Sequence, residues 1–123
     1  MELIIDLPAE ASRSPNKSIG RSFWVYQNHK DKCEKMLDAW EANNEKSVDM
    51  WEMPTTMTTI TIEGYGCRPK DPDNLVAGCK AIIDQLRYFG YIAEDNPTMV
   101  QLVVRSIKVK KRVDEKLRLI LTA

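Results

Sequence analysis

The feature of this sequence that most constrains its fold is an apolar stripe between residues 74 and 89. Apolar side chains stand at intervals of four, three, four and three residues, at Leu75, Cys79, Ile82, Leu86 and Phe89. This spacing follows the 3.6-residue period of an α-helix and predicts a helix over 74–89 with one apolar face. We expect this helix to end before Gly90, because glycine readily adopts the left-handed conformation that ends many helices.

The other segments complete a pattern of alternating strands and helices. Apolar positions at helical spacing predict a second helix over 22–43, and residues 9–20 have the composition of a loop. Alternating or β-branched residues predict four strands, over 2–7, 55–65, 99–110 and 116–122. We expect residues 111–115 to form the hairpin loop between the last two strands. The order β-α-β-α-β-β predicts a small α+β fold, a mixed sheet with two main helices packed on one face.

Length and composition limit the class of protein. With 123 residues, the chain has the size of one domain spanning 1–123. Hydrophobic residues make up 43% and charged residues 29%, which excludes a disordered, collagen-like or membrane protein. No apolar run approaches the ~20 residues of a membrane-spanning helix, and the N-terminus lacks the pattern of a signal peptide. We therefore expect a cytoplasmic protein.

The cysteines and the histidine carry no clear catalytic signal. Cys33, Cys67 and Cys79 are an odd number without CxxC spacing, so they predict neither a disulfide framework nor a zinc site. We expect small core residues instead. His29 is the single histidine.

The net charge of zero conceals an asymmetry. Residues 1–66 carry 7 basic and 11 acidic side chains, whereas residues 67–123 carry 11 basic and 7 acidic ones. The densest basic cluster comprises Arg105, Lys108, Lys110, Lys111 and Arg112. Such a split is typical of some chains that contact nucleic acid.

The chemistry-bearing segment begins with Asp71 and Asp73, which flank Pro72. One interpretation is structural, because Asp73 or Asn74 can cap the N-terminus of the following helix. The alternative is a cation site. In an extended segment, residues two apart project to the same side, and two adjacent carboxylates repel unless a cation neutralises them.

Two later segments extend this acidic pair. At 100° per residue, Lys80 and Asp84 share the helix face that begins at Asp73, and Glu94 and Asp95 follow in a loop that could return to the helix start. Carboxylates from two segments suit Mg²⁺, which keeps several waters for phosphate. A calcium loop is excluded, because the twelfth position from Asp71 is isoleucine rather than glutamate.

These residues carry a resemblance to a known family. The segment Asp-Pro-Asp-Asn-Leu-Val-Ala-Gly-Cys-Lys-Ala-Ile-Ile-Asp, followed by Gly-Tyr-Ile-Ala-Glu-Asp-Asn, resembles the signature of the RusA family of Holliday-junction resolvases, found in bacterial prophages and phages. The resemblance is specific over about residues 68–100, and Ser14-Pro15-Asn16-Lys17 is similar to a short segment after the family's first strand.

The resemblance implies a homodimeric, Mg²⁺-dependent endonuclease that cuts four-way DNA junctions, with Mn²⁺ as a possible substitute metal. By position, Asp71, Asp73 and Asp95 match the metal-binding aspartates, and Lys80 is similar to the catalytic lysine, although in some members that lysine stands closer to the Asp-Asn-Leu segment. Asp84 matches the acid one turn beyond the lysine, and Glu94 stands where an aspartate is usual.

This chemistry is consistent with phosphodiester hydrolysis. A metal on the aspartates would activate a water, and Lys80 would stabilise the developing negative charge. For phosphate contacts we expect Lys17, Arg21, Arg68 and Lys70. The alternative is a non-catalytic nucleic-acid-binding phage accessory protein with the same fold. A degenerate protein of that kind should have lost one of the three aspartates, and none is lost.

Overall fold

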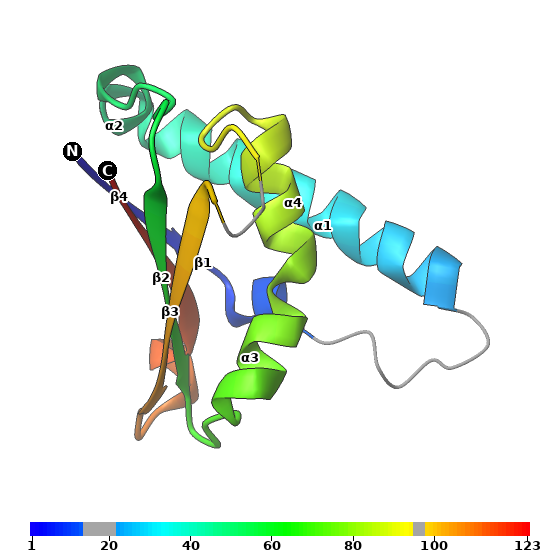
Figure 1. Cartoon of the computed structure of the whole chain (residues 1–123). Helices are drawn as coiled ribbons and strands as arrows, with labels where there is room; N and C mark the ends of the chain where they lie inside the picture. The colour runs from blue at the N-terminus through cyan, green and yellow to red at the C-terminus, as the bar shows by residue number, and fades with distance from the viewer. Residues whose placement is uncertain (14–21, 95–97) are drawn as a thin grey trace.

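A computed structural model contains a four-stranded mixed sheet with its main helices on one side (Figure 1). It describes residues 1–13, 22–94 and 98–123, and of residues 22–25 the backbone alone. The strands lie in the order β1-β4-β2-β3. β4 is antiparallel to both of its neighbours, whereas β2 and β3 are parallel. Their bounds are Glu2–Leu7 for β1, Thr58–Gly66 for β2, Val100–Lys108 for β3 and Lys116–Thr122 for β4.

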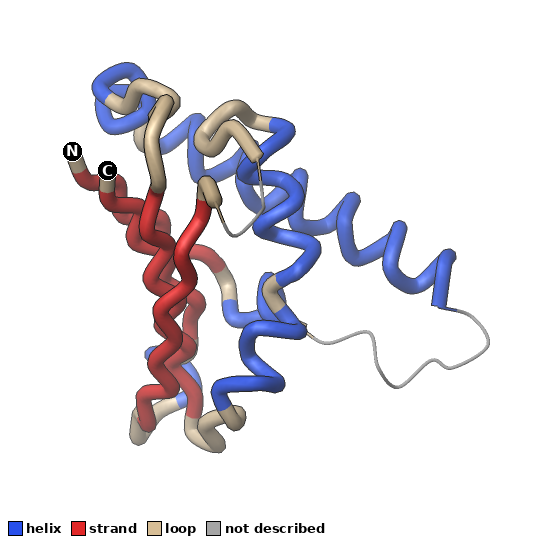
Figure 2. Tube along the Cα trace, in the orientation of Figure 1, coloured by secondary structure: helices blue, strands red, loops and turns tan. Residues whose placement is uncertain are grey.

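The helices form a second layer beside the sheet (Figure 2). α1 has the predicted bounds, Ser22–Asn43, and packs against α4. The sequence did not predict the six-residue helix α2, in the segment before Trp51. The remaining bounds are Ala9–Ser12 for the 3-10 helix η1, Glu45–Met50 for α2, Pro72–Gly78 for α3, Lys80–Tyr88 for α4 and Arg112–Asp114 for the 3-10 helix η2. The small α+β fold with a mixed sheet and helices on one face is therefore confirmed.

The core lies between the two layers. Alternate residues of β1 and β4 are buried, and the apolar stripe of α3 and α4 faces them as the spacing predicts. Burial of each large aliphatic side chain contributes about 1.5–3 kcal/mol relative to leaving it in water. The fully buried members include Ile5, Ile60, Ile62, Leu75, Ile82, Leu86, Leu117, Leu119 and Leu121.

Two of the three thiols are core residues, as expected, and Cys67 is not. Cys33 and Cys79 are buried, Cys67 is half-buried, and all three are free. Burial raises the pKa of Cys33 to about 11 and that of Cys79 to about 12. Both thiols therefore stay protonated and unreactive at neutral pH.

The prediction of a hairpin between the last two strands is wrong. β3 and β4 are not neighbours, because β2 lies between them and pairs with both. The connecting residues 111–115 contain neither glycine nor asparagine, the residues that tight hairpin turns favour, and they form η2 instead. The parallel pairing of β2 with β3 is a long-range feature that local patterns do not specify.

The predicted helix over 74–89 is two helices. The first begins earlier, at Pro72, whose fixed φ suits the first helical position. A break follows at Cys79, next to Gly78, a residue with low helix propensity. Leu75 of α3 packs closely on the sheet at Gly64, while α4 packs on α1.

The contact between Leu75 and Gly64 yields a stability prediction. A Cβ at position 64 would lie 2.9 Å from both terminal methyls of Leu75, which is 1% exposed. We expect Gly64→Ala to lower the free energy of unfolding by about 1–3 kcal/mol in urea titrations, as overpacking usually does. Gly66→Ala is the matched control, because its Cβ would meet nothing closer than 3.5 Å. Equal stability of the two variants would contradict the packing described.

Candidate metal and nucleic-acid site

The acidic pair lies at the start of α3. Asp71 is the residue before the helix, and its backbone oxygen accepts a hydrogen bond from Leu75 N at 2.9 Å. Its carboxylate makes no capping hydrogen bond. Asp71 and Asp73 are both exposed, and neither carboxylate has a hydrogen bond or ion pair within the described residues. Both groups are therefore free to bind a cation.

The local geometry differs from the expected extended segment. Asp71 is extended, with φ −58° and ψ 146°, but Pro72 and Asp73 already belong to the first helical turn. The argument that the two acids project to one side of an extended chain therefore does not apply. The helix-capping position also falls on Asp71, rather than on Asp73 or Asn74.

The loop that leads to Asp71 and the start of α3 is fastened at three points. The Cys67 amide donates to Oε2 of Glu115 at 2.9 Å, and the Ser106 hydroxyl donates to the backbone oxygen of Lys70. The Lys70 ammonium donates to the backbone oxygen of Ser12 at 2.6 Å. A loop held by β3, by the segment before β4 and by η1 can present its acids in a fixed position.

A hollow of about 110 Å³ adjoins this loop. Its cationic side chains are Arg68, Lys70 and Lys116, and Glu115 is its one carboxylate among the described lining residues. Partial burial of the amine lowers the pKa of Lys70. The hollow reaches to the residue directly before Asp71, so cationic and anionic groups meet at one edge of the sheet.

Parallel strand pairing brings the basic cluster to the same edge. Gly66, at the end of β2, lies opposite Lys108, at the end of β3, and Val109 N donates to Gly66 O at 3.0 Å. The exposed side chains of Lys108, Lys110, Lys111 and Arg112 follow from there. Sequence reasoning singled out this cluster but could not attach it to the acidic loop without the strand pairing.

Lys80 and Asp84, both on α4, lie beside the Tyr26 side chain of α1. The Tyr26 hydroxyl donates to Oδ2 of Asp84 at 2.5 Å, and Lys80 Nζ lies 5.8 Å from the centre of the Tyr26 ring. Lys30 Nζ lies 5.9 Å from the same ring. Burial, followed by the Asp84 carboxylate, raises the pKa of Tyr26. The prediction that Lys80 and Asp84 share a helix face with Asp73 assumed one unbroken helix. The helix is broken at Cys79, so this assumption does not hold.

The turn after α4 leads to Glu94. α3 begins at the lower end of the molecule in Figure 1, and the turn after α4 lies at the upper end. The seven residues of α3 and the nine residues of α4 lie between these two ends. Within residues 1–13, 22–94 and 98–123, no three acidic, histidine or cysteine side chains form a metal-binding group.

Three predicted site residues fall outside the described residues. These are Asp95, the third aspartate of the proposed metal site, together with Lys17 and Arg21 from the first loop. The side chain of Trp24 is also outside them, whereas Trp40 and Trp51 are core residues. His29 is buried near Cys33, with its Nε2 3.7 Å from Sγ, and burial lowers its pKa.

No model of a protein family matches the chain, and a search of curated proteins finds no significant match. Separately, none of the helices in the described residues has both the length and the apolar character needed to cross a lipid bilayer.

The contact between Tyr26 and Asp84 gives a second prediction. Tyr26→Phe removes the hydroxyl that Asp84 accepts from, so we expect unfolding to require about 1–2 kcal/mol less free energy. The control is Tyr88→Phe. Tyr88 is 67% exposed and its hydroxyl makes no hydrogen bond within the described residues. Chemical denaturation measures both variants, and a loss of stability in Tyr88→Phe equal to that in Tyr26→Phe would contradict the assignment.

Proposed function

We propose that this chain is a Mg²⁺-dependent endonuclease of the RusA type, which hydrolyses phosphodiester bonds in branched DNA such as four-way junctions. The observation that carries the proposal is the pair of exposed carboxylates of Asp71 and Asp73, which have no partner within the described residues and lie where a fastened loop enters α3, beside a cationic hollow. The resemblance of residues 68–100 to that family supports the same function. A DNA substrate of this kind also implies a cytoplasmic protein.

The donor chemistry fits a hard divalent cation. Two carboxylates leave most positions of an octahedral Mg²⁺ open for water and for phosphate oxygens, which is the usual arrangement in phosphate-processing sites. Asp71 and Asp73 would hold the metal, and the resemblance adds Asp95, which lies outside the described residues. When bound, such an ion lowers the pKa of a water and polarises the phosphate. Mn²⁺, with similar ligand preferences, is expected to substitute.

The cationic residues supply the rest of the chemistry. Arg68, Lys70 and the basic cluster after Lys108 would neutralise phosphates on either side of the acids. Lys80 lies on the next helix, and its ammonium would stabilise negative charge that develops in the transition state. Asp84, which is bound by the Tyr26 hydroxyl, would position that helix face rather than contact metal. Glu94, which follows the turn at the opposite end of the helical layer, is given no role at the acidic pair.

Paired cutting of a junction requires two sites. One chain offers one acidic pair, so a symmetric homodimer would supply the second. It would also bring two basic halves, each of net +4, to one substrate.

A labelled four-way junction, a matched linear duplex and Mg²⁺ form the primary assay. We expect paired nicks in the junction and none in the duplex, with loss of cutting on chelation. Binding of the junction without cutting, in Mg²⁺ and in Mn²⁺, would instead favour the non-catalytic nucleic-acid-binding protein.

The third prediction concerns the acidic pair. Asp73→Asn keeps the size of the side chain but removes a charge that a metal requires, so cleavage should fall by orders of magnitude while stability changes little. Junction binding should survive or tighten, because a negative charge near phosphate is lost. The control is Asp49→Asn at an exposed position of α2. Cleavage by Asp73→Asn at the wild-type rate in Mg²⁺ would refute the metal assignment.

The fourth prediction separates the lysine from the acids. If Lys80 stabilises the transition state, Lys80→Ala should lower turnover by ~10²-fold or more without moving the Mg²⁺ concentration for half-maximal rate. Lys30→Ala is a matched control, since Lys30 lies over the same Tyr26 ring at nearly the same distance. A strong shift in the Mg²⁺ dependence would show that Lys80 organises the metal ligands instead.

A further inference from the structure

His29 is the one histidine of the chain and lies on α1 with 9% of its surface exposed. Its ring donates a hydrogen bond to the backbone oxygen of Ala11, and its Nε2 lies 3.7 Å from Sγ of Cys33. Ala11 belongs to η1 and is fully buried. Both ring contacts are with neutral groups, so neither supplies a negative charge that would offset a proton on the ring.

The charged groups that face His29 are all cations. Within the described residues they come from three elements: Lys32 from α1, Arg13 from the residue directly after η1, and Lys70 from the loop before α3. None of the three forms an ion pair in that part of the chain. A proton on His29 would therefore add a fourth positive charge to a cluster that already lacks a carboxylate partner.

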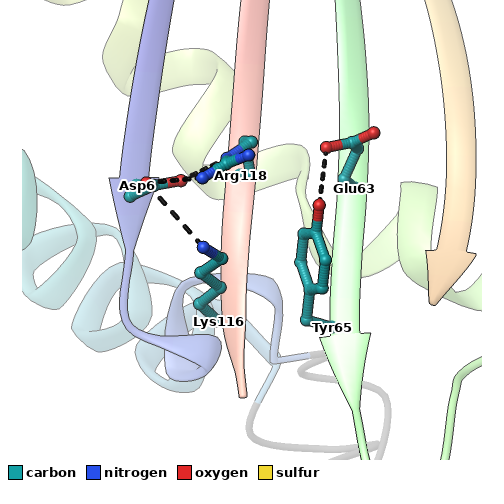
Figure 3. Close-up of polar contacts among 5 residues, drawn as sticks. All are labelled: Asp6, Glu63, Tyr65, Lys116 and Arg118. Carbon is teal, nitrogen blue, oxygen red and sulfur yellow. Dashed lines mark hydrogen bonds and ion pairs between the residues drawn. The ribbon is translucent and has the colours of Figure 1, made fainter. Parts of the chain in front are cut away.

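The open face of the sheet shows the opposite arrangement. Figure 3 shows Arg118 and Lys116 beside the carboxylate of Asp6, with nitrogen–oxygen distances of 2.7 Å and 3.9 Å. There, one carboxylate serves two cations. The cations around His29 have no such partner among the described residues, so the two clusters should respond differently to an added proton.

η1 connects His29 to the loop that leads to Asp71. Its last two residues present adjacent backbone oxygens to two different elements, since Ala11 accepts from His29 and Ser12 accepts from the Lys70 ammonium at 2.6 Å. η1 also packs against α3, α4, β2 and β4, and Figure 1 shows it in blue between the sheet and the helices. Because Lys70 is the residue directly before Asp71, a displacement of η1 would loosen the hold on the start of α3.

We propose that η1 is a pH-sensitive link, in which a proton on His29 loosens η1 and thereby releases the loop that holds Asp71. At neutral pH the uncharged ring keeps η1 against α1, and Lys70 stays bound to η1. In acid, the imidazolium repels Lys70 and Arg13 and requires hydration, so the packing of η1 opens. The regulation of a metal site by this link rests on the proposed function, whereas the link itself does not.

The direction of the pH dependence follows from these contacts. Burial, together with the neighbouring cations, lowers the pKa of His29 and outweighs the hydrogen bond to Ala11, which acts in the other direction. The unfolded chain, with an ordinary histidine pKa of about 6.5, therefore takes up the proton first as the pH falls. The contribution of the neutral ring is fully present above pH ~6.5 and is lost as the pH falls through the lower pKa of the folded state.

The proton NMR signal of the single imidazole measures its titration directly, without DNA or added metal. We expect a midpoint below pH 6.5. Lys70→Met removes one of the facing cations, so the midpoint should rise by roughly 0.3 pH units or more. Lys35→Met is the matched control, because Lys35 is an exposed lysine elsewhere on α1, and it should leave the midpoint unchanged.

Amide hydrogen exchange measures the release of η1 and of the start of α3. The Ala11 amide donates to the backbone oxygen of Pro8, and the Leu75 amide donates to that of Asp71. Between pH 7.5 and 5.5, protection of both amides should fall by roughly threefold or more in the wild type. It should stay constant in His29→Gln, whose amide group can donate to Ala11 but takes up no proton. Both amides should exchange faster than those of the β1–β4 pairing, because η1 opens without the sheet.

The outcomes are distinct. A wild-type midpoint at or above pH 6.5, an unchanged midpoint in Lys70→Met, or an equal loss of protection in His29→Gln would each overturn the link. Exchange of the Ala11 amide only as fast as the sheet would show global unfolding in acid and would also overturn it. If His29→Gln does not fold, the wild-type midpoint and Lys70→Met decide the result. Cleavage is not a readout, so the failure of this link and the failure of the nuclease proposal are distinguishable.

Discussion

The parallel pairing of β2 with β3 is the constraint on which the rest of the structure depends. Parallel neighbours cannot be joined by a tight turn, so the chain must cross back over the sheet, and α3 and α4 form that crossover. The loop after β2 and the end of β3 consequently meet at one edge. Asp71, the cationic hollow and the basic cluster after Lys108 lie at this edge, whereas the turn that carries Glu94 lies at the other. Ligands tend to bind where strands of this kind end, which agrees with the position of the proposed site.

The sheet separates two tasks by its two faces. Alternate residues of β1 and β4 are leucines and an isoleucine that are buried against the helices, and this burial stabilises the fold. The intervening residues, among them Ile4, Asp6 and Arg118, lie on the open side. A shift of one residue in the register would exchange the two sets, so the packing that fixes the core also fixes which side chains the open face presents.

Much of the fold could be predicted from the sequence because its signals are local. The period of the stripe from Leu75 to Phe89, the alternation around Ile60 and the helix over 22–43 each report burial on one side of an element. The break at Cys79 and the separation of β3 from β4 could not be predicted in this way, since they depend on contacts between segments that are far apart in the sequence. For the site, Asp71 and Asp73 were predicted as candidate metal ligands from their spacing in the sequence. The hydrogen bond from the Tyr26 hydroxyl to Asp84 was not predicted, because it joins residues 58 positions apart.

The central claim is that the N-terminal end of α3 binds a divalent metal. The most direct measurement is the broadening of backbone amide signals by low concentrations of Mn²⁺ in an NMR spectrum of the isotopically labelled chain. The account predicts that the strongest broadening lies around Asp71 and Asp73 and extends to the adjoining ends of β2 and β3, and that Asp73→Asn removes it. Broadening centred on the acidic groove lined by Asp38, Glu41, Glu45 and Asp49, and unchanged by Asp73→Asn, would contradict the account.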